Sequence, residues 1–190
     1  MDYPAIKRCI DVGMSALALC MLIPLLVFAA VIIMLDSPGS PLFFQQRIGL
    51  GGKPFKMVKF RSMVKDAPSL GPWHTLENDT RITRVGRFIR RTSLDELPQL
   101  WNVLVGEMSL VGPRPETPAQ QALYQPADWE IRHRVRPGIT GLSQVSGRSN
   151  LTTEERLKYD LAYASAHTPA MDISILLKTI WHVICRTGVN

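Results

Sequence analysis

An uncharged stretch of 24 residues, 12–35, constrains the fold of this chain more than any other feature. As an α-helix rising about 1.5 Å per residue it would reach about 36 Å, which exceeds the roughly 30 Å hydrocarbon core of a bilayer. It is also longer than the apolar part of a secretory signal peptide, which has about 7 to 15 residues, and no small-residue cleavage site stands out near Asp36. The stretch therefore predicts a membrane anchor.

The anchor can either span the bilayer or enter and leave on the same side. Pro24 divides it into two halves of 12 residues. Each half would reach only about 18 Å as a helix, and an interior proline removes a backbone hydrogen bond and kinks the helix. Lys7 and Arg8 precede the stretch, and no acidic residue occurs between positions 37 and 65. The basic residues that follow the stretch are Arg47, Lys53, Lys56, Lys59, Arg61 and Lys65. Because basic flanks tend to stay in the cytoplasm, a helix-break-helix hairpin is favoured, and a continuous span is the alternative.

Length and charge bound the domain organisation and the partners. With 190 residues, of which 46% are hydrophobic, the chain can bury one core, so we expect an anchor at 1–36 and one catalytic domain at 37–190. The net charge of +6 suits an anionic partner, which could be nucleic acid, an acidic bilayer or a phosphorylated metabolite. The three cysteines and four histidines have no disulfide or metal-ligand spacing, so we expect reduced thiols and structural imidazoles.

Periodicity after the anchor predicts an α+β domain that is mostly helical. Two β-like runs, 42–48 and 54–63, are joined by a glycine-rich turn and predict a hairpin. The turn has neither phosphate-loop nor dinucleotide-fingerprint spacing, which favours a plain turn. Residues 81–91 predict a short amphipathic helix with an arginine face. Residues 152–166 and 169–185 predict two longer helices, and the apolar stripe of the second fits either a core helix or an interfacial helix on the bilayer.

Residues 93–100 place two adjacent carboxylates, Asp95 and Glu96, just downstream of a dense arginine cluster. The run fits a capping box, in which Ser93 and Glu96 would only stabilise a helix N-terminus. Pro98 prefers the first helical turn, however, which would leave both acids at or just before the start of the helix. Unpaired backbone donors there make a good meeting place for a metal and a phosphate. A structural cap and a catalytic pair both remain open at this point.

Several arginines downstream stand in stiff proline or glycine frames. Arg114 lies between two prolines, and Pro115 biases it toward an extended backbone, so less entropy is lost when its guanidinium binds an oxyanion. Arg136 precedes a proline and a glycine, and Arg148 follows Gly147. A solvated charge run rarely places its arginines in such frames, so anion binding is a hypothesis for each of them, beside the alternative of a plain surface charge.

Taken in order, these motifs resemble the bacterial sugar transferases, in particular the small monotopic phosphoglycosyl transferases. The matching residues are Lys7, Arg8 and Asp11 at the anchor, 59–63, 93–100, 112–115, 136–141 with Gly147 and Arg148, and Tyr159 with Asp160. They cover nearly the whole chain, and the match is to the minimal form, without the additional spans and the appended domain of larger relatives. Many small members carry serine before the anchor proline, whereas this chain has Ile23 before Pro24. The difference bears on how sharply the helix breaks.

The resemblance implies transfer of a sugar-1-phosphate from a UDP-sugar to a polyprenol phosphate such as undecaprenyl phosphate. This reaction gives a polyprenyl diphosphate sugar and UMP, as the first membrane step of glycoconjugate assembly. The resemblance also implies a monotopic protein of the bacterial cytoplasmic membrane whose catalytic domain faces the cytoplasm. Asp95 would be the nucleophile that forms an aspartyl-phosphosugar, Glu96 would assist it, and both acids would bind Mg²⁺. Substrate contacts are expected from Lys59, Arg87, Arg114, Arg136 and Arg148, and a less defined polar role from Asp160.

Two other classes of protein compete with the transferase. A membrane-tethered nucleic-acid-binding module would use the basic helix at 81–91 and the arginines at 132–136, but aromatic residues do not interleave these patches as a stacking platform requires. A scaffold that only anchors partners would tolerate substitution of Asp95. The sequence leaves open which sugar is transferred, which polyprenol length is preferred and whether the protein forms a homodimer.

Overall fold

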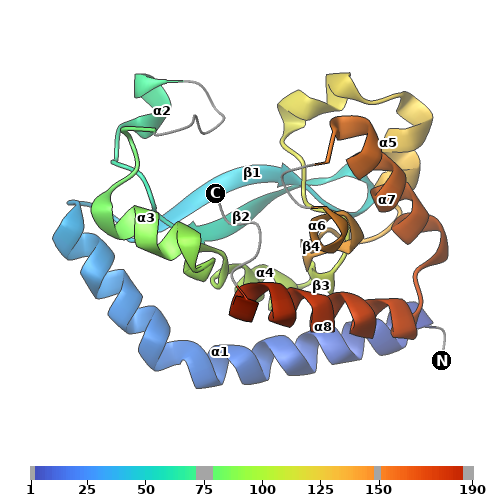
Figure 1. Ribbon diagram of the computed structural model, residues 1–190, viewed down its shortest axis with the longest axis horizontal. Helices are drawn as coiled ribbons and strands as arrows, with labels where there is room; N and C mark the ends of the chain where they lie inside the picture. Colours follow the sequence, from blue (N-terminus) through green and yellow to red (C-terminus); the bar gives the residue numbers. More distant parts are fainter. Residues whose placement is uncertain (1–2, 72–78, 148–150, 186–190) are drawn as a thin grey trace.

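The fold begins with one long helix on which the other elements are packed. The computed structural model describes residues 3–71, 79–147 and 151–185, except for the side chains of Pro68 and Ile184. Figure 1 shows the long helix α1 along one side of the molecule. In chain order the elements are α1 (Tyr3–Asp36), β1 (Leu42–Ile48), the 3-10 turn η1 (Leu50–Gly52), β2 (Pro54–Phe60), α2 (Ala67–Leu70), α3 (Arg84–Arg91), η2 (Leu94–Glu96), α4 (Gln99–Val105), β3 (Ser109–Val111), η3 (Pro118–Leu123), α5 (Pro126–Arg132), β4 (Gly138–Thr140), α6 (Leu142–Ser146), α7 (Thr153–Ala166) and α8 (Pro169–Cys185).

Helix α1 is bent rather than broken. It is helical from Tyr3 to Asp36 with Pro24 inside it, and Figure 1 shows the helix bending along its length. A proline removes one backbone hydrogen bond and clashes with the preceding turn, which bends a helix without ending it when the neighbouring bonds remain. The expected pair of separate helices is therefore a single helix with a bend.

Polar side chains tie the first half of α1 to the domain. The guanidinium of Arg8 donates to the carbonyls of Val103 (2.6 Å) and Leu104 (2.9 Å). These carbonyls belong to the last turn of α4, where helical acceptors lack intrahelical donors. The buried carboxylate of Asp11 accepts from the N–H of Leu110 in β3 at 3.0 Å. Arg8 and Asp11 thus attach the anchor to the domain.

Apolar packing and one cap hold the second half of α1. Ala29 and Ile33 are buried in a cluster with Phe60 of β2 and a residue of α3. At the end of the helix, the carboxylate of Asp36 accepts from the N–H of Val85 at 3.0 Å and so caps the first turn of α3. Both halves of the anchor therefore contact the same domain.

Two small sheets organise the domain. Strands β1 and β2 pair antiparallel along their length, which confirms the predicted hairpin with a shorter second strand. Strands β3 and β4 pair parallel, and they are too short for an alternating pattern to reveal them in the sequence. Three apolar clusters, which include Ile33, Met57 and Tyr163, form the core around these sheets.

Three predicted helices are confirmed, with small changes at their ends. Helix α8 has the predicted bounds, and α7 starts after Thr152, whose hydroxyl accepts from the N–H of Glu155 at 3.2 Å. The N–H of Thr152 in turn donates to the carboxylate of Glu155 at 2.9 Å. Helix α3 starts later than predicted because Thr83 caps it, accepting from the N–H of Gly86 at 2.9 Å. Capping residues thus set the first residue of each helix.

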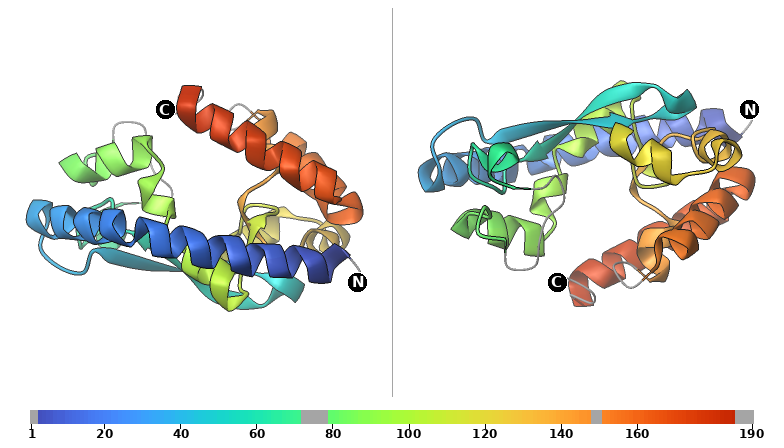
Figure 2. Two further views of the ribbon diagram at one scale, coloured as in Figure 1. Left: turned by 90° about the horizontal axis from the view of Figure 1, so that it is seen from below. Right: turned by 90° about the horizontal axis from the view of Figure 1, so that it is seen from above.

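Helices α1 and α8 lie along the same side of the molecule and diverge from the end at which α1 begins (Figure 2). At that end, the carboxylate of Asp172 in α8 accepts from the hydroxyls of Tyr3 and Tyr163, each at 2.7 Å, and from the ammonium of Lys7. This shared acceptor fixes the start of α1 to the start of α8. The large apolar side chains that α8 exposes are Ile173, Leu177, Ile180, Trp181 and Val183.

Candidate active site

The two adjacent acids lie in the η2 turn, which leads into α4. Leu94, in the same turn, packs on the cluster that contains Ile33 and so fixes the turn to the core. Ser93 has left-handed backbone angles (φ 56°, ψ 17°), and its side chain makes no capping hydrogen bond. The capping-box interpretation is therefore wrong, because an N-cap residue needs an extended backbone to bring its hydroxyl to the first turn. A left-handed non-glycine residue stores strain of about 1–3 kcal/mol, and such strain is concentrated at functional sites.

Three segments that are far apart in the sequence meet at Glu96. Its carboxylate accepts from the guanidinium of Arg114 at 3.0 Å and lies 3.7 Å from the ammonium of Lys59. Lys59 lies near the end of β2, and Arg114 follows β3. The structure thus brings four of the predicted site residues together: Asp95, Glu96, Lys59 and Arg114.

Asp95 is the acid of this pair that is left unbonded. Within the described residues, its carboxylate takes part in no side-chain hydrogen bond or ion pair. Burial, and then the neighbouring charge of Glu96, raise the pKa of Asp95 to about 6. The carboxylate is therefore still ionised at neutral pH, and its raised basicity makes it a better nucleophile than an ordinary aspartate.

The pKa values of Glu96 and Lys59 are lowered, whereas that of Asp95 is raised. Burial alone would raise the pKa of Glu96, but Arg114 and Lys59 outweigh burial and hold this pKa below its usual value. Burial, and then repulsion from Arg114, lower the pKa of Lys59 to about 8. Glu96 is therefore kept ionised as the counter-charge of the two cations, and the two neighbouring acids suit different roles.

Asn102 fixes the strand that carries Lys59 to the helix that follows the acids. Its buried side-chain carbonyl accepts from the N–H of Val58 at 3.0 Å, and its amino group donates to the carbonyl of Lys56 at 2.8 Å. The amide of Asn102 thus pairs with β2 as a further strand would, which satisfies the backbone groups at that edge. This connection holds the strand that carries Lys59 beside α4, the helix that directly follows η2.

Arg47 is a cation of the site that the sequence analysis did not single out. Its guanidinium donates to the carbonyl of Pro115 at 2.8 Å. Burial, and then repulsion from Arg114, lower the pKa of Arg47 to about 10. The hairpin register pairs position 47 with 55 and position 43 with 59, which places Arg47 and Lys59 on the same face of the sheet. The alternation of the predicted strands could therefore have identified Arg47.

The chemistry of these side chains bears on whether the site fits Mg²⁺. Among the described residues, no group of three or more histidine, cysteine, aspartate or glutamate side chains converges. Mg²⁺ is commonly bound by one or two carboxylates together with substrate phosphates and water. Asp95 and Glu96 supply such a pair, whereas the nearby cations would repel a metal that arrived without a diphosphate. The donor set therefore fits Mg²⁺ held jointly by the protein and a phosphorylated substrate.

Arg136 lies at the opposite end of α4 from the acids. Its Nε donates to the carbonyl of Gly106 at 2.9 Å, one residue after the helix ends. The glycines that follow Arg136 serve close backbone packing, because a Cβ on Gly138 would lie 2.1 Å from the nitrogen of Gly112. The glycines that suggested a phosphate contact are therefore explained by close packing between β4 and the segment after β3.

Two further predicted substrate residues, Asp160 and Arg87, make no hydrogen bond or ion pair with Asp95 or Glu96 within the described residues. Asp160 is 1% exposed, and its two oxygens accept from Arg132 at 2.7 Å and from Ser143 at 2.8 Å. Arg87 is exposed on α3, and Arg148 lies outside the described residues. With both oxygens occupied by protein donors, the position of Asp160 indicates a structural role.

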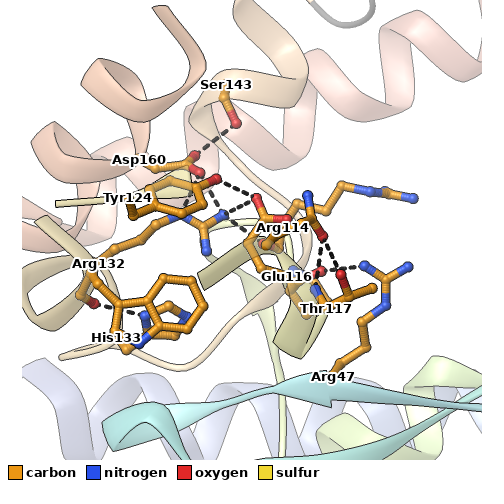
Figure 3. Close-up of polar contacts among 12 residues, drawn as sticks. Arg47, Arg114, Glu116, Thr117, Tyr124, Arg132, His133, Ser143 and Asp160 are labelled. Atoms are coloured by element: carbon orange, nitrogen blue, oxygen red, sulfur yellow. Dashed lines mark hydrogen bonds and ion pairs between the residues drawn. The ribbon is translucent and has the colours of Figure 1, made fainter. Parts of the chain in front are cut away.

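Figure 3 shows the second, buried charge cluster next to the backbone of Arg114. Arg132 donates to Asp160 through Nε (3.0 Å) and Nη2 (2.7 Å), and it lies 3.3 Å from Glu116. The hydroxyl of Tyr124 donates to Glu116 at 2.7 Å. In the sequence, Arg132 is one of several arginines in a basic run, and its carboxylate partner comes 28 positions later. No local pattern therefore indicates that it is buried.

Comparisons with known proteins agree with the motifs. The family model described as bacterial sugar transferase matches residues 2–186. The UDP-galactose-lipid carrier transferase of Erwinia amylovora is 42% identical over 198 residues, which cover 96% of this chain and 41% of the relative. The undecaprenyl-phosphate glucose phosphotransferase of Komagataeibacter xylinus is 46% identical over 185 residues, which cover 92% of this chain and 35% of the relative. The exopolysaccharide production protein PSS of Rhizobium leguminosarum bv. phaseoli is 43% identical over 192 residues, which cover 95% of this chain and 96% of the relative.

The chain covers very different shares of the length of these relatives. The chain spans 41% and 35% of the first two relatives, and nearly all of the third. Their names refer to sugar transfer or polysaccharide production and not to nucleic acid, so the nucleic-acid-binding alternative has no support. Helix α1 is long and apolar enough to cross a membrane, by length and composition, and 11% of its most apolar window is buried. A core helix would be mostly buried, so α1 indicates association with a membrane.

Proposed function

This chain belongs to the bacterial sugar transferase family, and from that premise we propose that it transfers a sugar-1-phosphate from a UDP-sugar to a polyprenol phosphate such as undecaprenyl phosphate. One observation carries the proposal: Asp95 has a raised pKa and no side-chain partner in the described chain, beside a Glu96 that Arg114 and Lys59 hold. The names of two relatives specify UDP-galactose and undecaprenyl phosphate, which supports this donor and acceptor.

In the first step, a carboxylate oxygen of Asp95 attacks the phosphorus atom that is joined to the sugar. The bond from that phosphorus to the bridging oxygen breaks, and UMP leaves with the electron pair of that bond. The sugar phosphate remains on Asp95 as a mixed anhydride. Arg114 and Lys59 stabilise the negative charge on the phosphoryl oxygens, which would otherwise repel the attacking carboxylate. Arg47 adds positive charge close to Arg114.

In the second step, an oxygen of the polyprenol phosphate attacks the same phosphorus. The bond from that phosphorus to Asp95 breaks, the carboxylate is regenerated, and a polyprenyl diphosphate sugar leaves as the lipid-linked product. Two steps let a soluble donor and a lipid acceptor use one site in turn. When bound by Asp95 and Glu96, Mg²⁺ supplies neutralisation of the diphosphate charge.

The anchor enters and leaves the membrane on one side in this proposal. Arg8 and Asp11 attach the first half of α1 to α4 and β3, whereas Asp36 caps α3 at its other end. A helix that crossed about 30 Å of hydrocarbon would place these ends on opposite faces of the bilayer. One domain cannot hold both ends in that arrangement without burying charged groups in lipid. The attachments at both ends therefore support a re-entrant helix that bends near Pro24.

Other surfaces of the domain suit the same membrane. Between its two attachments, α1 exposes the apolar side chains Leu17, Met21, Ile23, Val27 and Phe28. Helix α8, which exposes several apolar side chains, lies along the same side of the molecule as α1 (Figure 2), and an interfacial helix would be placed in this way. Helix α3 adds the exposed Arg84, Arg87 and Arg91, which suit anionic headgroups. The basic flanks favour the cytoplasmic face of the inner membrane.

The transfer is tested by UMP release from a panel of UDP-sugars, with the full chain in vesicles that contain undecaprenyl phosphate and Mg²⁺. We expect lipid-dependent release with at least one UDP-sugar. With the lipid omitted, the Asp95 peptide should gain the mass of one sugar phosphate. Asp66→Asn is a matched control, because Asp66 is an exposed acid whose side chain caps nothing. Release of UMP from none of the UDP-sugars would contradict the proposal.

The topology is tested by labelling single cysteines from outside intact cells. The two sites are Ala5→Cys and Gln46→Cys, which flank the bent part of α1 at exposed positions, in a background with serine at Cys9, Cys20 and Cys185. A membrane-impermeant maleimide should label neither site in intact cells and both sites after permeabilisation. Labelling of one site in intact cells would show that α1 spans the membrane.

A further inference from the structure

The segment that carries Arg114, residues 113–116, is held by its carbonyl groups. Two of its four residues are prolines, which have no N–H to donate. The outer two carbonyls accept from backbone N–H groups at the end of β1 and the start of β4, both at 2.9 Å. The inner two carbonyls accept from the guanidinium groups of Arg47 (2.8 Å) and Arg132 (2.6 Å). All four acceptors of this segment are therefore occupied, and two of them depend on arginine side chains.

Arg132 reaches this segment from the buried cluster of Figure 3, and its orientation is fixed there. Its side chain is 1% exposed, and Nη2, which donates to the carbonyl of Arg114, also donates to Asp160 and lies within 3.3 Å of Glu116. The other oxygen of Asp160 accepts from Ser143 at 2.8 Å. The guanidinium thus has one orientation in which it satisfies both carboxylates and the carbonyl together.

Stability alone does not account for this burial of charge. The desolvation of buried ions commonly cancels what their pairing contributes, so a well-packed apolar cluster would stabilise a fold as well. An apolar cluster, however, has no donor for the carbonyl of Arg114. The planar fork of an arginine can bind a carboxylate and a carbonyl at once with fixed geometry. What Arg132 supplies is therefore a directional hydrogen bond at a defined point of the chain.

We infer that Arg132 is a positioning residue for Arg114 and that Asp160 holds Arg132 in orientation. Arg132 acts through the carbonyl of Arg114, and the guanidinium of Arg114 in turn reaches Glu96 at 3.0 Å. In the proposed reaction this guanidinium binds the phosphate oxygens of the donor. The identity of that donor rests on the proposed function, whereas the connection between the two arginines rests on the geometry. Loss of the connection should weaken anion binding only while Arg114 is present.

The test is a double-mutant cycle between Arg132→Lys and Arg114→Ala. It is read as the affinity of the full chain for inorganic pyrophosphate in the presence of Mg²⁺, measured by calorimetry. Lysine keeps a positive charge beside Asp160 but cannot bind both Asp160 and the carbonyl. We expect Arg132→Lys to weaken pyrophosphate binding about tenfold when Arg114 is present and to have no effect when it is alanine. Equal losses in both backgrounds, or no loss in either, would overturn the inference.

Two further variants separate positioning from stability. Arg134→Lys is the matched control, because Arg134 lies two residues further on and pairs with Glu130 in solvent; it should leave the affinity unchanged. Asp160→Asn preserves the volume of the cluster and should cause a smaller loss that again depends on Arg114. Unfolding of both Arg132→Lys and Asp160→Asn would assign the cluster to stability and overturn the inference.

The calorimetric readout also separates this inference from the proposed function. A wild-type chain that binds pyrophosphate through Arg114 but releases no UMP from any UDP-sugar would contradict the transferase and leave the link between Arg132 and Arg114 supported. A wild-type chain that binds no pyrophosphate would overturn the link itself, because Arg114 would then contact no phosphate.

Discussion

Two clusters of acidic and basic side chains adjoin the 113–116 segment, and they differ in what they leave unbonded. In the open cluster, Asp95 has no side-chain partner among the described residues, and Arg114 is 41% exposed. In the closed cluster, Arg132 and Asp160 are each 1% exposed and are bonded to one another. The same residue types thus remain open to a ligand in one cluster and bind one another in the other, according to whether donors and acceptors are left available.

The largest expected effect is the loss of activity when the charge of Asp95, which lies in the open cluster, is removed. Asp95→Asn keeps the side-chain volume, and the carboxylate of Asp95 has no hydrogen bond to lose within the part of the chain that the structure describes. We expect the rate of UMP release to fall by about 10⁴-fold or more, as for the removal of other covalent nucleophiles. The melting temperature should change by less than about 2 °C. Near-normal turnover by this variant would show that Asp95 is not the nucleophile.

The next largest expected effect is that of metal removal, which should abolish activity in the open cluster without changing stability. In the open cluster the carboxylate of Asp95 is left for Mg²⁺, so excess EDTA should reduce UMP release to background, and added Mg²⁺ should restore it. The melting temperature of the ligand-free chain should not change, because the ion pairs Arg114–Glu96 and Arg132–Asp160 form without metal. A rate that is unaffected by EDTA would remove Mg²⁺ from the reaction.

Removal of one acid from each cluster should then lower mainly stability in the closed cluster and mainly activity in the open cluster. Asp160→Ala leaves Arg132 buried without its main counter-charge and should lower the free energy of unfolding by about 3–5 kcal/mol. Glu96→Gln, at a side chain that is 21% exposed, should lower UMP release far more than it lowers stability. Urea unfolding curves and rates of the two variants provide the comparison. Equal destabilisation by both would remove the distinction between the clusters.

The smallest expected effect concerns His133, which adjoins the closed cluster and packs against Trp129 with tilted rings whose centroids are 4.1 Å apart. Burial lowers the pKa of His133 below 6.5; Arg132 also opposes its protonation, and Glu116 favours it. Below about pH 6.5 the unfolded chain binds a proton that the folded chain does not, so stability should be full above this pH and decline below it.

His133→Phe keeps an aromatic ring and removes the titration. On acidification from about pH 7.5 to about pH 5.5, the melting temperature of the variant should fall by about 2 °C less than that of the wild type. Differential scanning fluorimetry at both pH values makes the measurement. Parallel decreases in the two proteins would show that His133 contributes nothing to the acid sensitivity.

Local patterns were sufficient for the elements that depend on local physics. Alternation around a glycine-rich turn predicted the hairpin, and a broad apolar stripe predicted residues 169–185 as a helix. Pro98 indicated that Asp95 and Glu96 would lie just before α4, as they do. Their roles in catalysis remain predictions that the variants above will test.

Long-range contacts decided the features that local patterns missed. In the sequence, Arg132 is one member of a basic run, and Asp160 is a polar residue without a defined role. The partner that explains each of them lies 28 positions away. The glycines after Arg136 suggested a stiff frame for an anion-binding arginine, whereas Gly138 is required by its contact with Gly112. The left-handed backbone of Ser93 likewise has no sequence signal, since serine is also the usual helix cap.

The contact between Lys7 and Asp172 also sets an order of events during synthesis. The two residues are 165 positions apart, and at about 5–20 residues per second the ribosome needs roughly 8–33 s to pass from one to the other. Helix α1 therefore emerges long before the carbonyls, N–H groups and carboxylate that will bind Lys7, Arg8 and Asp11 exist. Helix α1 is thus available to a membrane before the domain can fold onto it.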